Sequence, residues 1–106
     1  MTISPWTPDF LDPHGWAIPF GVPGESAAKR VHYENPEVGD IAIAAGKETD
    51  QEKRAQMYLE FQKKLLEDAP FIGLIQPKVL IAVGNDVQGY VFNPVWWVDL
   101  YGLDKE

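Results

Sequence analysis

The chain has 106 residues, of which 45% are hydrophobic, 12% aromatic and 24% charged. This supply of apolar side chains excludes a disordered chain and fits one domain or part of one. The absence of cysteine excludes disulfides, thiolate metal sites and cysteine nucleophiles. Nine basic and sixteen acidic residues give a net charge of −7, so we expect neither a nucleic-acid partner nor binding to anionic membrane surfaces.

Residues 1–34 form a Pro/Gly-rich segment. Its opening, MTISPWTPDF, has neither a basic n-region nor an apolar h-region, so we expect no signal peptide in this chain. Five prolines lie within residues 1–25, and because proline fixes φ and removes an N–H donor, they predict an irregular backbone there. Large apolar side chains such as Trp6 and Phe10 nevertheless predict that this segment packs on something.

Residues 35–69 are predicted to form a helical pair. Asn35 is a good N-cap, Pro36 suits the first helical position, and the resulting helix is expected to end near residues 46–49. Asp50 caps a second, amphipathic helix at about 51–68, which Pro70 stops. The apolar face predicted for this second helix consists of Ala55, Tyr58, Leu59, Gln62, Leu65, Leu66 and Ala69, with Met57 and Phe61 beside it.

Residues 70–106 are predicted to hold three or four short strands. The candidate runs are Phe71–Ile75, Val79–Val83, Val87–Phe92 and Trp96–Tyr101, separated by proline, glycine and asparagine. The order of elements is therefore an irregular segment, two helices and then short strands, which indicates an α/β fold class.

The residue types that catalyse reactions form no recognisable arrangement. His14 and His32 show no metal-ligand spacing, and neither Ser4 nor Ser26 lies in a nucleophile motif. Gly21–Gly24 contains proline where a phosphate loop needs N–H donors. The carboxylates considered for acid–base pairs are Asp9, Asp12, Asp99 and Asp104, and nothing in the sequence indicates that any two of them meet. The sequence predicts no enzyme, no cofactor and no metal site.

The aromatic residues and Asp9 leave two interpretations open. Asp9 lies next to Phe10 and near Trp6, in a setting where a carboxylate can bind an ammonium group by a charge-assisted hydrogen bond. The alternative is an aspartate that caps a turn. Likewise Trp6 and Trp96-Trp97 either line a pocket or belong to the core.

Four segments, in order, resemble the periplasmic oligopeptide- and dipeptide-binding proteins of bacterial ABC importers. Residues 6–13 are similar to the family's W-x-x-D-x-x-D-P stretch, and residues 35–38 to its N-P-x-V/F helix start. Residues 54–74 are similar to its long helix ending in D-A-P and an apolar strand, and residues 87–94 to its V-x-G-[FY]-x-x-N/D-P segment. The chain resembles the C-terminal end of proteins that are several times longer.

The resemblance implies part of a two-lobed receptor that closes on a peptide or similar small solute, works at the periplasmic or extracellular face of the membrane, and delivers to an ABC permease. It also implies that Asp9 pairs with the α-amino group of the peptide and that Trp6 shapes the pocket wall. On this basis residues 1–106 are a partial solute-binding domain, either a fragment or a truncated product. Because its strands would lack partners, we expect a homo-oligomer. The alternative is an oligomerising structural fragment that binds no ligand of its own.

Overall fold

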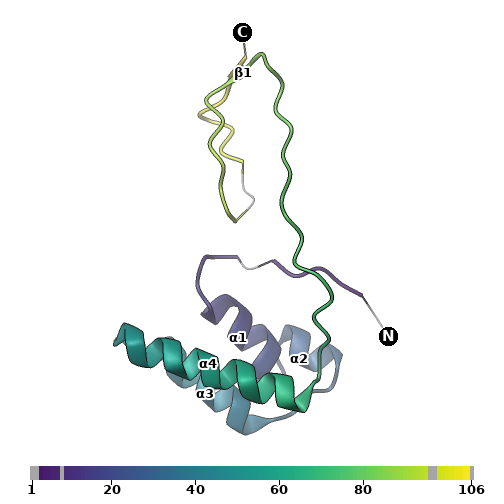
Figure 1. Ribbon diagram of the computed structural model, residues 1–106, viewed down its shortest axis with the longest axis vertical. Coiled ribbons are helices and arrows are strands. Elements are labelled where there is room, and N and C mark those ends of the chain that lie inside the picture. Colours follow the sequence, from purple (N-terminus) through teal and green to yellow (C-terminus); the bar gives the residue numbers. More distant parts are fainter. Residues whose placement is uncertain (1–2, 8, 96–97, 106) are drawn as a thin grey trace. The chain divides into compact units, whose positions relative to one another are not determined.

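The computed structural model describes residues 3–7, 9–95 and 98–105. They divide into two compact units, one formed by Pro8–Gly73 and the other by Met1–Thr7 with Leu74–Glu106. The first unit is helical, and the second holds a two-stranded sheet (Figure 1). The described chain is thus mostly helical, and the predicted number of strands is not confirmed.

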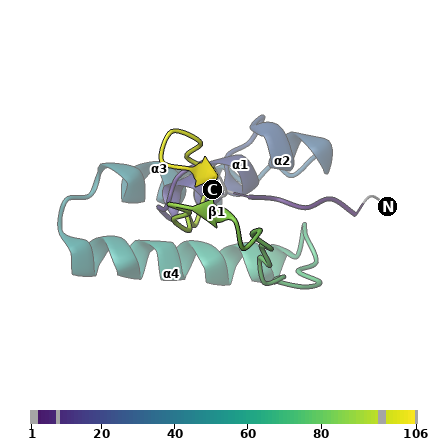
Figure 2. The ribbon, with the colours of Figure 1, turned by 90° about the horizontal axis from the view of Figure 1, so that it is seen from above.

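Helices α3 (Pro36–Lys47) and α4 (Gln51–Asp68) form the centre of the helical unit. The Asn35 side chain accepts from the N–H groups of Glu37 and Val38, which caps α3 as the sequence predicts. Asp50 caps α4 by accepting from the N–H of Lys53 at 3.0 Å. Figure 2 shows the two helices side by side, joined by the short loop at their ends.

The buried face of α4 is rotated from the predicted one. Tyr58 and Phe61 are its buried residues, whereas Leu59 and Leu66 remain 45% and 74% exposed. Phe61 packs over Gly21, where there is no side chain, so the ring fills space that the sequence pattern of α4 alone does not indicate. The core of the unit consists of Ala17, Val38, Ala42, Ala45, Tyr58 and Phe61.

The prediction of an irregular backbone through residue 25 is wrong for the helix α1 (His14–Gly21), and α2 (Ser26–Arg30) follows it. The prolines do not prevent α1, because Pro13 stands at its N-cap and only Pro19 lies inside it. Asp12 Oδ1 accepts from the N–H of His14 at 2.8 Å and so satisfies an amide of the first turn. Packing of Ala17, 1% exposed, on the neighbouring helices stabilises α1 despite the hydrogen bond that Pro19 removes.

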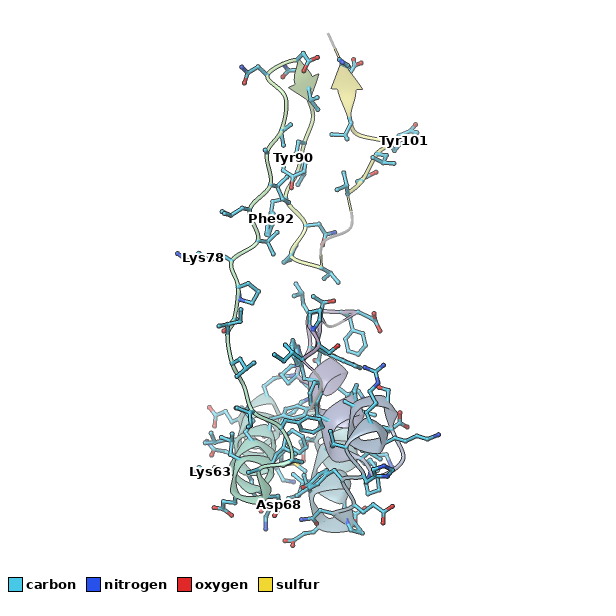
Figure 3. The ribbon with its side chains drawn as sticks, turned by 90° about the vertical axis from the view of Figure 1, so that its right-hand side faces the viewer. Lys63, Asp68, Lys78, Tyr90, Phe92 and Tyr101 are labelled. Carbon is cyan, nitrogen blue, oxygen red and sulfur yellow. The ribbon has the colours of Figure 1, made fainter. Side chains whose placement is uncertain are left out.

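The sheet unit contains β1 (Val87–Gln88) and β2 (Asp104–Lys105), which pair antiparallel. Gly89 follows β1 with φ +76°, and a Cβ there would collide with the carbonyl oxygen of Gly102. This left-handed backbone ends the strand that the sequence extends to Phe92. Figure 3 labels Tyr90 and Phe92 on the segment after β1, and Tyr101 on the one before β2.

The strands predicted at Phe71–Ile75 and Val79–Val83 are not formed in the described chain. A β-strand needs a neighbour to pair its N–H and C=O groups, and an apolar run alone supplies none. The fourth candidate, Trp96–Tyr101, lies partly outside the described residues, and its described part, residues 98–101, is not a strand.

Candidate functional site

Asp9, the predicted ligand-binding carboxylate, lies in the helical unit just before α1. It is exposed, and its neighbour Phe10 is 48% exposed. A tight turn follows, in which the N–H of Asp12 donates to the carbonyl of Phe10 at 3.0 Å. Asp9 is thus an exposed residue directly before an ordered turn. The Phe10 ring lies 3.4 Å from where a Cβ of Gly15 would stand, and the partly apolar surroundings of Asp9 stay a prediction.

Trp6, the other predicted site residue, belongs to the sheet unit and is half-buried there. The structure describes the two units separately, so the joint site of Asp9 and Trp6 stays a prediction. Trp96 and Trp97, considered above as pocket-lining residues, lie outside the described residues.

Arg54, on the first part of α4, joins the turn that follows Asp9 to the helices. Its Nη2 donates to Asp12 Oδ1 at 2.6 Å, and its Nε donates to the carbonyl of Ala45 at 3.1 Å, near the end of α3. The hydrogen bond from Arg54, together with that from the backbone of His14, holds the pKa of Asp12 below its ordinary value. Asp12, predicted above only as a candidate for a carboxylate pair, forms an ion pair with the Arg54 guanidinium.

Tyr58 and His14 complete this polar cluster. The Tyr58 hydroxyl accepts from Arg54 Nη2 at 3.2 Å and lies 3.4 Å from Nδ1 of His14. The Arg54 guanidinium carbon lies 5.0 Å from the centroid of the Tyr58 ring, and burial raises the pKa of the tyrosine. His14 packs against Gly46, where a Cβ would approach its Nδ1 to 2.6 Å. It therefore has a structural role, and the exposed His32 lies elsewhere, in the turn after α2.

We define these four residues, Asp12, His14, Arg54 and Tyr58, as the Arg54 cluster. The sequence motifs did not indicate this cluster. No local pattern joins its members, because Arg54 and Asp12 lie 42 residues apart in the sequence.

A second polar cluster joins the start of α3 to the end of α4. Asp68 Oδ2 accepts from the Tyr33 hydroxyl and from Asn35 Nδ2, both at 2.6 Å. Burial, and then the hydrogen bond to Asp68, raise the pKa of Tyr33 well above its usual range. The same bonds lower the pKa of Asp68. Figure 3 labels Asp68 on α4. This cluster fixes the ends of the helix pair.

Within the described residues, no three histidine, aspartate or glutamate side chains gather in a way that would hold a metal ion. None of the described helices combines the length and the apolar character that a membrane span requires. In the helical unit the Arg54 guanidinium pairs with Asp12, and Asp9 is exposed.

Two curated proteins are similar to most of the chain. One is the probable D,D-dipeptide-binding periplasmic protein of Escherichia coli, 35% identical over 101 residues, which covers 90% of this chain and 19% of that protein. The other is the di/tripeptide-binding protein 4 of Pseudomonas aeruginosa, 29% identical over 97 residues, covering 90% of this chain and 18% of that protein.

The chain thus spans about a fifth of the length of these relatives. No family model matches it, and no solved structure does. The resemblance stated from the four sequence segments is confirmed: over 90% of its length the chain corresponds to a segment of a periplasmic dipeptide-binding protein.

Proposed function

We propose that this chain is part of a solute-binding receptor for peptides or similar small solutes, which feeds an ABC transporter. The observation that carries the proposal is the similarity over 90% of the chain to a protein named for binding dipeptides in the periplasm. In this proposal the chain contributes to a two-lobed fold, acts in the periplasm and catalyses no reaction. The partners are a peptide and a permease.

Asp9 is the proposed anchor of the ligand. Asp9 is exposed directly before an ordered turn, and a charge-assisted hydrogen bond to the α-amino group of a peptide contributes about 1.5–3 kcal/mol. Trp6 is the proposed pocket wall, where its half-buried ring would contact apolar parts of the ligand.

Titration calorimetry with dialanine of either chirality tests the role of Asp9. We expect N-acetylated dialanine to bind more weakly than the free peptide, because acetylation removes the charged amine. Asp9→Asn should abolish this difference, and Asp40→Asn, which changes an exposed carboxylate on α3, should not. The titration is run on this chain and on a longer protein that contains it. Absence of binding in both, or a difference that survives Asp9→Asn, would refute the assignment.

The alternative function is that of an oligomerising structural fragment. Its support is the segment of residues 72–83, which forms no strand and has highly exposed apolar side chains. Among them Ile75 is 85% and Leu80 91% exposed. A second copy that pairs with this segment would cover these side chains and satisfy its backbone. A homo-oligomer without peptide binding would favour this alternative.

A further inference from the structure

We infer that Arg54 is a positioning residue for Asp9: by holding Asp12 against α3 and α4, it fixes the turn that presents the Asp9 carboxylate to a cationic ligand. This inference rests on the role proposed for Asp9. It assigns a second, indirect contribution to ligand binding within the helical unit.

Arg54 connects three separate parts of the helical unit. Its guanidinium donates to Asp12 ahead of α1, to the Ala45 carbonyl of α3 and to the Tyr58 hydroxyl of its own helix. Only 18% of the Arg54 side chain is exposed, against 34% for Asp12. Because the planar guanidinium makes all three bonds at once, it defines the place of the Asp12 carboxylate more closely than a single ion pair would.

Because Asp9 is only three residues before Asp12, restraints on Asp12 also limit the position of Asp9. Its N–H donates to the carbonyl of Phe10, its side chain accepts from the N–H of His14, and its carbonyl accepts from the N–H of Gly15. Asp12 is therefore held on its side chain and on both backbone groups. Three residues of extended chain span at most about 10 Å, so fixing Asp12 keeps Asp9 within that distance, and the hydrogen bond from Asp12 to Phe10 shortens the connection further.

The test compares Arg54→Gln, Arg54→Lys and the matched control Lys53→Gln, whose side chain is 69% exposed and pairs with Glu48. Two readouts are measured: the ratio of affinities for free and N-acetylated dialanine, and hydrogen exchange at the amides of Asp12 and His14. We expect Arg54→Gln to lower the ratio about tenfold and to speed exchange by a similar factor. Arg54→Lys should restore part of both, and Lys53→Gln should change neither.

If Arg54 had a purely structural role, Arg54→Gln would weaken the binding of both peptides equally and leave the ratio of their affinities unchanged. That result would overturn the inference. So would unchanged exchange at His14. If Arg54→Gln does not fold, the same two readouts are measured on Asp12→Asn. The ratio of affinities for free and N-acetylated dialanine should fall in this variant too. A protein that never distinguishes the two peptides refutes the role of Asp9 itself; the exchange data then still show whether Arg54 holds the turn.

Discussion

Substitution of Gly21 by alanine is the sharpest test of how α1 packs on α4. Gly21 is the last residue of α1 and is buried. A Cβ at this position would lie 2.8 Å from Cζ of Phe61 and closer still to its Cε2. Phe61 is only 5% exposed and belongs to the core, so the ring cannot move aside without disturbing its neighbours. The added methyl group therefore overpacks this contact.

The expected magnitude follows from two opposing terms. Overpacking a core contact costs about 1–3 kcal/mol, and replacing a helical glycine by alanine returns about 0.5–1 kcal/mol. The net loss of unfolding free energy lies between about 0 and 2.5 kcal/mol, with a central value of about 1 kcal/mol that lowers the Tm of a unit of this size by about 4–8 °C. Thermal unfolding followed by far-UV circular dichroism measures it.

Gly15→Ala is the matched control, because Gly15 lies in the same helix and its Cβ would meet the Phe10 ring at an ordinary 3.4 Å. Its Tm should stay the same or rise. Phe61→Leu should relieve part of the Gly21→Ala defect, so the two substitutions should not be additive. A Tm of Gly21→Ala at or above wild type would refute the packing described between α1 and α4.

Three further predictions concern the polar clusters and the apolar segment. Asn35→Asp keeps the cap of α3 but places a second carboxylate beside Asp68, so its Tm deficit should be largest near neutral pH and shrink below about pH 4. Asp12 has a lowered pKa in the folded state, so its stabilisation is present above the unfolded value of 3.8 and is lost as pH falls through the folded value. The Tm deficit of Asp12→Asn should therefore shrink as the pH falls further below 3.8, as thermal unfolding across pH would show. Leu80→Lys, at a 91% exposed position, should lower the mass from light scattering if copies pair through residues 72–83; a wild-type monomer at high concentration would refute the homo-oligomer.

Local sequence signals sufficed where the structure depends on local contacts. The start of α3 follows from the cap of Asn35 and the fixed φ of Pro36, and α4 spans Gln51–Asp68, the range its pattern predicts. Both helices satisfy their backbone internally, so the sequence of each is enough to indicate it. The buried face of α4 was less predictable, because it depends on the gap at Gly21 in another helix.

Structure that depends on distant partners was not predictable in this way. Helix α1 forms in spite of Pro19 because Ala17 packs on other helices. The number of prolines in the segment does not reveal this tertiary packing. The apolar run Val79–Val83 satisfies every compositional criterion for a strand, yet a strand also needs a neighbour with which to pair. The position of the Asp12 carboxylate depended likewise on Arg54, 42 residues away.

The polar clusters give a physical reason why the segments of the resemblance occur together. Asp12, in the first segment, binds Arg54 at the start of the third, and Asn35, in the second, binds Asp68 in the third, 33 residues away. Removal of one of these side chains leaves the charged or amide group of its partner without that hydrogen bond, which costs stability. The first three segments are therefore linked as the scaffold of the helical unit. Only Asp9 and Trp6 among their residues are proposed to touch the ligand, so the segments predict the kind of receptor far better than the solute that it binds.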